Sequence, residues 1–158
     1  MPRRSSASGR DERNWPTTRR EEDYLEAIYT IQMESGVARP TEVSKMLGIR
    51  PACVTEMFQK LQGKELVEYK RYYGARLTPE GRRIGMAVKD RHDSLRQFLL
   101  YLDVQEPVAS IDACTLEHYL SPETIMQIKR FNSFLAQGEG EPPWLLDFKV
   151  RSRQGRLP

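Results

Sequence analysis

The chain has 158 residues, of which 39% are hydrophobic and 30% are charged, and its formal net charge is +3. This balance is typical of a soluble globular protein with much exposed helix. No apolar run approaches the roughly 18 residues of a membrane span, and residues 1–6 lack the apolar core of a secretory signal. The two cysteines, Cys53 and Cys114, form no disulfide framework, so we expect a cytoplasmic protein without a membrane partner.

The charge is unevenly distributed along the chain. Residues 1–84 contain 16 lysines and arginines against 12 aspartates and glutamates, whereas residues 85–158 contain 9 against 10. A basic first half suits a polyanionic partner. Residues 1–16, which are rich in arginine, serine and glycine, are predicted to form a disordered arm with a single aromatic residue, Trp15.

The first predicted helix begins at Thr17 or Thr18 and ends at Gly36, with an apolar stripe along one side. Asp23 and Glu26 are i, i+3 neighbours at the border of this stripe. Acidic residues early in a helix are more often partners of the helix dipole than ligands, so both interpretations stay open at this point.

Residues 40–61 have the spacing of a helix-turn-helix: a short helix with Thr41 as its N-cap, a turn at Gly48, and a second helix with Pro51 in its first position. One face of the second helix is apolar and would enter the core. Another face is small and polar, which suits the DNA major groove, although a plain solvated face is the alternative. This face carries Ala52, Thr55, Glu56 and Gln59, with Lys60 beside them.

Two short runs within residues 66–77 flank a turn that contains Gly74, which predicts a β-hairpin. Lys70, Arg71 and Arg76 are interleaved there with Tyr72 and a second tyrosine. A basic, aromatic hairpin directly after a helix-turn-helix is typical of a wing that lies on DNA phosphates. This succession is the strongest indication of nucleic-acid binding in the sequence.

A long helix is predicted to begin after its N-cap, Thr78, with Pro79 in its first position, and to end at about Leu102. A helix of this length can leave one subdomain and enter another. His92 falls on its apolar stripe, where a histidine is more often a satisfied core residue than a metal ligand.

A short helix that ends near Leu120 carries Cys114, Glu117 and His118 at positions i, i+3 and i+4. On a helix these three side chains would project from one side of about one turn. Their thiol, carboxylate and imidazole groups are all metal-ligating groups, so a structural patch and a metal site are equally good interpretations of this cluster alone.

The next helix is predicted from Pro122 to about Ala136, after an N-cap at Ser121. Two amphipathic helices this small cannot bury both of their faces, and packing against a second copy of the chain would solve this. Residues 137–158 are predicted to pack loosely or wander, with Trp144 as a candidate anchor.

Metal-ligating side chains thus come from three separate predicted helices. If these helices pack together, one site collects all of them, and the mixture of oxygen, nitrogen and sulfur donors suits a divalent first-row ion. The carboxylates favour Mn(II) or Fe(II), whereas a thiolate favours iron, cobalt or zinc. The predicted ligands are Asp23, Glu26, His92, Cys114, Glu117 and His118.

Residues 18–136 resemble the DtxR/MntR family of metal-dependent bacterial repressors. The resemblance lies in DYLEAIY (23–29), VT (54–55), QKL (59–61), LTPEG (77–81), RH (91–92) and EHYLS (117–121). It implies a mainly α fold, in which an N-terminal winged helix-turn-helix with a small β-hairpin wing (17–84) precedes an all-helical metal-binding and dimerisation domain (85–136). The long helix (about 79–102) would link the two, and the SH3-like third domain of the longer iron repressors is not expected here.

Within this resemblance, five of the six predicted ligands match positions of the manganese-responsive branch. Cys114 departs from that branch and is similar to the iron-responsive branch, which in turn has methionine at the position of Asp23. The ligand set is therefore a hybrid, with Fe(II) or Mn(II) as the expected cofactor and up to two ions per subunit.

The resemblance implies a repressor of metal homeostasis, which binds double-stranded, palindromic operator DNA as a metal-loaded homodimer. We expect neither catalysis nor an organic substrate. A metal-independent winged-helix regulator that senses an organic ligand or oxidation of Cys114 is the alternative, and a metallohydrolase is a more distant one. The predicted DNA contacts are Arg50, Pro51, Ala52, Thr55, Glu56, Gln59, Lys60, Lys70, Arg71, Tyr72 and Arg76.

Overall fold

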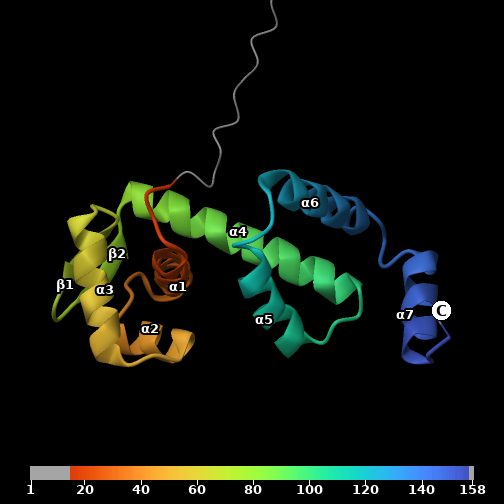
Figure 1. Ribbon diagram of the computed structural model, residues 1–158, viewed down its shortest axis with the longest axis horizontal. Helices are drawn as coiled ribbons and strands as arrows, with labels where there is room; N and C mark the ends of the chain where they lie inside the picture. The colour runs from red at the N-terminus through yellow and green to blue at the C-terminus, as the bar shows by residue number, and fades with distance from the viewer. Residues whose placement is uncertain (1–14, 157–158) are drawn as a thin grey trace, which may run out of the picture.

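The computed structural model describes residues 15–156, and within this range the chain forms seven helices and one two-stranded hairpin (Figure 1). The mainly helical winged-helix fold predicted from the sequence is confirmed. No helix in the described range is both long and apolar enough to cross a membrane. The elements are α1 (Arg19–Ser35), α2 (Pro40–Leu47), α3 (Pro51–Gly63), β1 (Val67–Lys70), β2 (Gly74–Leu77), α4 (Pro79–Tyr101), α5 (Glu106–Leu116), α6 (Pro122–Ala136) and α7 (Pro143–Arg153).

Side-chain caps set the beginning of three helices. The hydroxyls of Thr18, Thr78 and Ser121 accept hydrogen bonds from backbone N–H groups in the first turns of α1, α4 and α6. The prediction for α2 was wrong by two residues, because Arg39, and not Thr41, is its N-cap. Pro40 takes the first helical position, where its missing N–H costs nothing.

The first half of the chain packs around one large apolar core. The buried faces of α1, α2 and α3 meet the hairpin and the first turns of α4, and Phe58 packs edge-on against Tyr69 at 5.3 Å between ring centroids. β1 and β2 pair in antiparallel register, from Val67 opposite Leu77 to Lys70 opposite Gly74. The hairpin lies beside α3 at one end of the molecule (Figure 1).

The long helix α4 crosses from this core to the second half of the molecule (Figure 1). It lies very close to α1 at Gly85, where a Cβ atom would stand 2.6 Å from the carbonyl oxygen of Leu25. Only glycine permits this approach, because any side chain would meet backbone. The close packing places the acidic border of α1 beside the middle of α4.

The second half is built from α5 and α6, which pack on the far part of α4 around Leu95, Ala113 and Ile125. The prediction that the helix carrying Glu117 continues to about Leu120 was wrong, because α5 ends at Leu116. The residue before a proline is pushed out of helical geometry, and Ser121 is extended accordingly. An extended Ser121 limits the helix to Leu120 at most, and the structure ends it earlier, with turns over residues 117–119.

Two predictions about the ends of the chain need correction. Residues 1–14 of the predicted arm lie outside the described residues, as do 157–158, but Trp15 packs against the first core and is not part of a free arm. The predicted tail contains α7, which the sequence did not indicate. Its buried residue is Leu145, whereas Trp144 is 53% exposed.

Candidate metal centre and DNA-binding surface

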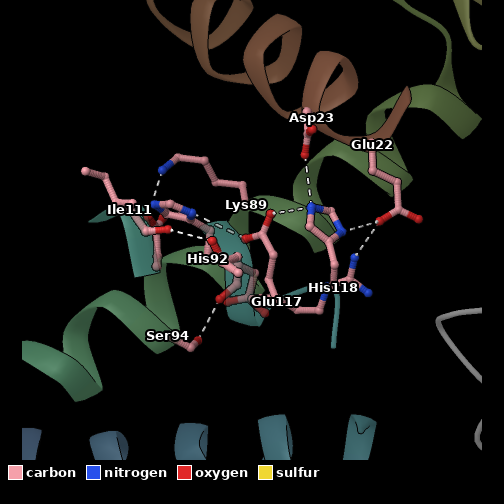
Figure 2. A network of polar contacts seen from close by, with 12 residues as sticks. Glu22, Asp23, Lys89, His92, Ser94, Ile111, Glu117 and His118 are labelled. Atoms are coloured by element: carbon pink, nitrogen blue, oxygen red, sulfur yellow. Dashed lines mark hydrogen bonds and ion pairs between the residues drawn. The ribbon is translucent and has the colours of Figure 1, made fainter. Parts of the chain in front are cut away.

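Five of the six predicted ligands converge between the two halves of the molecule. Asp23 and Glu26 come from successive turns of α1, and His92 comes from α4. Glu117 and His118 lie on the turn that directly follows α5, and Glu117 stands between the two imidazole rings in Figure 2. Three segments that are distant in sequence thus supply one cluster of polar side chains.

The Glu117 carboxylate joins two groups of ligand atoms. Its Oε1 lies 3.3 Å from Nε2 of His118, which in turn lies 3.0 Å from Oδ1 of Asp23. Its Oε2 lies 3.3 Å from Nδ1 of His92, and Glu26 completes the second group. Within each group the candidate donor atoms all lie within 4.8 Å of one another. One shared carboxylate therefore connects two three-residue groups.

The surroundings of Glu117 fit a divalent cation. The residue is 1% exposed, and neither carboxylate oxygen accepts a well-aligned hydrogen bond from any described residue. A buried carboxylate without donors is costly, and it stands here among two further carboxylates, from Asp23 and Glu26. A bound divalent ion would supply the missing positive charge, and the oxygen and nitrogen donors are those that Mn(II) and Fe(II) accept.

The metal-free protein keeps protons in this cluster. Burial, together with the neighbouring Glu117 carboxylate, raises the pKa of Glu26 to about 7. The hydrogen bond to Asp23 raises the pKa of His118 to about 9, and the Glu117 carboxylate raises the pKa of His92. These protons occupy the positions that a cation would otherwise take.

Cys114 is the predicted ligand that the structure leaves outside both groups. The residue is exposed on α5, one turn before Glu117. Partial burial of its sulfur, together with the nearby carboxylates of Glu117, Asp23 and Glu26, raises the pKa of the thiol to about 11. The i, i+3 spacing placed the thiol near the site but not within ligand distance.

The predicted DNA contacts of α3 lie on its exposed side. Arg50, Pro51, Ala52, Glu56 and Gln59 are all exposed. Two other predicted contacts have intramolecular partners. The Thr55 hydroxyl donates to the Pro51 carbonyl at 3.2 Å, and the Lys60 ammonium lies 3.1 Å from Oε1 of the buried Glu21.

The hairpin presents its basic and aromatic residues to solvent. Lys70, Arg71 and Arg76 are exposed, and Tyr72 at the tip is 87% exposed. The guanidinium carbon of Arg71 lies 5.9 Å from the centre of the Tyr72 ring. Because the hairpin and α3 lie at the same end of the molecule, these groups and the polar face of α3 can meet one duplex (Figure 1).

The sequence profile described as "Iron dependent repressor, N-terminal DNA binding domain" matches residues 16–75, and the profile described as "Iron dependent repressor, metal binding and dimerisation domain" matches residues 78–144. The HTH-type transcriptional regulator MntR of Geobacillus kaustophilus is 37% identical over 134 residues, which are 85% of this chain and 95% of that protein. The chain belongs to the DtxR/MntR family of metal-dependent transcriptional repressors. MntR of Bacillus pumilus is also 37% identical, over 138 residues.

Solved structures of DtxR/MntR-type proteins share the architecture. A manganese-dependent transcriptional repressor in complex with manganese is 27% identical, with a TM-score of 0.64 over 72% of this chain and 53% of that one. IdeR of T. acidophilum is 25% identical, with a TM-score of 0.62 over 74% and 55%. The chain thus spans little more than half the length of these two solved proteins.

Two residues beside the centre of this DtxR/MntR-type chain were missed by sequence reasoning. Glu22 lies 3.6 Å from Nδ1 of His118, and the buried Arg91 donates to the same Glu22 oxygen at 3.2 Å. The signals were present, because Glu22 precedes Asp23 and Arg91 precedes His92. An acid in the first turns of a helix is also a common partner of the helix dipole, so its position alone does not indicate this contact.

Proposed function

We propose that this chain represses transcription of metal-homeostasis genes as a homodimer loaded with Fe(II) or Mn(II). The observation that carries the proposal is the buried Glu117 carboxylate, which lacks aligned donors and joins two ligand groups drawn from three segments. The named relatives are transcriptional regulators, which favours a regulator over a metallohydrolase.

The coupling between the metal centre and DNA binding is proposed to run through α1. This helix carries Asp23 and Glu26 on one side and buries Tyr24, Leu25 and Ile28 in the core that also holds α3. A bound cation would supply attraction between the α1 carboxylates and the ligands of the second half. Holding α1 against α4 and the Glu117 turn then fixes the orientation of the whole DNA-binding half, including α3 and the wing.

The identity of the metal follows from the donor set. The two groups offer carboxylate oxygens and imidazole nitrogens, whereas the Cys114 thiol stands outside them. Hard oxygen donors favour Mn(II) and Fe(II) over the softer-ligand metals. Because Glu117 is shared, we propose up to two ions per subunit.

A second copy of the chain is proposed to cover α5 and α6. Val108 and Ile111 are i, i+3 neighbours on α5 and are 50% and 67% exposed, and Phe134 on α6 is 68% exposed. The profile matched by this half is described as a dimerisation domain. In such a dimer the two α3 helices would enter successive major grooves about 34 Å apart.

The test is a DNA-binding titration. A high-affinity duplex is first selected from random-sequence DNA in the presence of Mn(II), and its binding is then followed by fluorescence anisotropy with Mn(II), with anaerobic Fe(II) and with a chelator. We expect tight binding with either ion and a large loss with chelator. His92→Ala and Glu117→Ala should abolish the response to metal, whereas equal binding with and without metal in the unchanged protein would refute the proposal.

A further inference from the structure

The histidine at the centre has a carboxylate at each ring nitrogen. Nε2 of His118 faces Asp23 and Glu117, and Nδ1 faces Oε2 of Glu22 at 3.6 Å (Figure 2). Glu22 belongs to neither group of candidate ligand atoms. Its position on the opposite edge of the ring is that of a group which orients a ligand and does not itself bind the metal.

Glu22 is itself held in place from two sides. Nη2 of Arg91 donates to its Oε2 at 3.2 Å, and the Thr17 hydroxyl donates to its Oε1 at 3.3 Å. Arg91 reaches across from α4, so the Glu22–Arg91 ion pair also connects α1 to α4. A carboxylate with a fixed direction can select one orientation of the ring beside it.

Burial makes this arrangement rigid. The side chains of His118, Arg91 and Glu22 are 8%, 6% and 14% exposed. The guanidinium carbon of Arg91 lies 5.5 Å from the centre of the Trp15 ring, which covers it from the segment before α1. Charges that are shielded from water interact more strongly and exchange partners less readily than charges on the surface.

We propose that Glu22 and Arg91 are positioning residues of the metal centre, with Trp15 as their cover. Glu22 faces Nδ1 of His118 at 3.6 Å and favours a proton on that nitrogen, which keeps Nε2 directed toward Asp23 and Glu117. Arg91 fixes the direction of Glu22, and Trp15 limits the access of water to Arg91. The inference rests on the proposed metal-dependent function and adds that the segment before α1 contributes to ligand geometry.

The test compares three variants of residues on α1 in the full-length protein, with diamagnetic Zn(II) as the probe. Glu22→Leu removes the acceptor at similar volume, and Glu22→Gln keeps an acceptor oxygen that Arg91 can still hold. Glu34→Leu is the control, because Glu34 is exposed on the same helix. Zn(II) affinity is measured by competition with a chromophoric chelator. The His118 tautomer is measured by 15N NMR of the metal-free protein above its pKa of about 9, where the ring is neutral, and the spectrum is simple because the chain has two histidines.

We expect Glu22→Leu to lower Zn(II) affinity by about 10- to 100-fold, as is typical for partners behind a metal ligand. Its His118 ring should lose the single Nδ1–H tautomer. Glu22→Gln should restore most of the affinity and the tautomer, and Glu34→Leu should match the unchanged protein. Arg91→Met should weaken binding less than Glu22→Leu does, because the Glu22 acceptor stays while its direction is no longer fixed.

Two results would overturn the inference while leaving the proposed function intact. One is an unchanged affinity and tautomer in Glu22→Leu. The other is an equal loss of affinity in Glu22→Leu and Glu22→Gln with the tautomer unchanged, which would show a purely structural role. If the unchanged protein took up no Zn(II), Mn(II) or Fe(II), the proposed function would fail as well.

Discussion

The two halves of the molecule differ in how they are held together. The DNA-binding half has a large apolar core, and its one fully buried acid, Glu21, is neutralised by Lys60 and Lys64 at 3.1 and 2.9 Å. The second half has a small core, exposes Ile111 and Phe134, and keeps the buried Glu117 carboxylate without an aligned donor.

This difference shows where each half obtains its stability. The first half pairs its buried acid with two lysines of the same half. The site between the halves gathers three carboxylates that a cation would compensate, and the second half leaves the apolar side chains of Ile111 and Phe134 exposed. A half that is incomplete alone is suited to sensing, because the binding of a missing component changes its structure and stability.

The largest effect is expected at the residue shared by both ligand groups. Glu117→Gln should lower Mn(II) affinity by more than about 100-fold, which exceeds the usual loss for an outer partner. The same change removes a buried charge, so the melting temperature of the metal-free protein should stay the same or rise. Isothermal calorimetry and thermal unfolding measure the two quantities, with Glu34→Gln on the exposed side of α1 as the control. An unchanged Mn(II) affinity in Glu117→Gln would contradict the assignment of Glu117 as the ligand shared by both groups.

Acidity should affect the second half more than the first. At neutral pH a cation must displace the proton of His118, whose pKa is about 9, and below pH 7 also that of Glu26, whose pKa is about 7. Mn(II) affinity should therefore fall by about 100-fold or more from pH 8 to pH 6, because each displaced proton costs tenfold per pH unit. Chelator competition at three pH values measures this, and a constant affinity would contradict it.

The buried ion pairs of Glu21 in the first half should not respond over that range of pH. Burial raises the pKa of Glu21, but the hydrogen bonds from Lys64, Thr18 and Lys60 outweigh it and bring the pKa to about 2. A depressed carboxyl pKa adds stability that is complete above about pH 4.5 and is lost as the pH falls toward 2. The stability that Glu21 and its lysine partners contribute should accordingly be equal at pH 6 and pH 8, as measured by denaturant unfolding of Glu21→Gln and the unchanged protein at both pH values.

The contact between the halves can be tested with two glycines. Gly85→Ala should destabilise the protein by about 1–3 kcal/mol, because its Cβ would meet the backbone of Leu25. It should also weaken Mn(II) binding by forcing α1 away from α4. Gly63→Ala at the end of α3 meets open space and should instead stabilise by about 0.5–1 kcal/mol. Chemical denaturation measures both changes, and the same sign for both would count against the packing argument.

The smallest effect is expected at the wing. Arg71→Ala should weaken DNA binding to a similar extent on all sequences and reduce the slope of log affinity against log salt by about 0.9, as for one lost phosphate contact. Arg151→Ala, exposed on α7 at the opposite end of the molecule from the wing (Figure 1), is the matched control and should leave the slope unchanged. A loss confined to one sequence would instead assign Arg71 to base recognition.

Much of the fold was predictable because its signals are local. A capping hydroxyl followed by proline sets the start of α4 at Thr78 and of α6 at Ser121, and glycines end α1 and α2. Helix α7 was not predicted, since the glycines and prolines around it conceal a short helix. The place of Trp15 was missed as well, because it depends on two arginines of α4.

The candidate site was predictable in its residue types but not in its geometry. Spacing brought Asp23 and Glu26 to one side of a helix, and their meeting with His92 required only that the helices pack together. Spacing could not show that Cys114 lies outside the ligand groups, since this depends on how α5 ends. It also could not assign Glu22 to His118, because the contact joins residues 96 positions apart.

The most direct measurement is anomalous diffraction on either side of the manganese absorption edge, from crystals grown with Mn(II). We expect a manganese peak bounded by Glu117 together with ligands from both α1 and the second half of the chain. We also expect a twofold axis that relates two copies of the chain through α5 and α6. A peak that touches residues of one helix only, or no peak beside Glu117, would contradict the proposed metal centre.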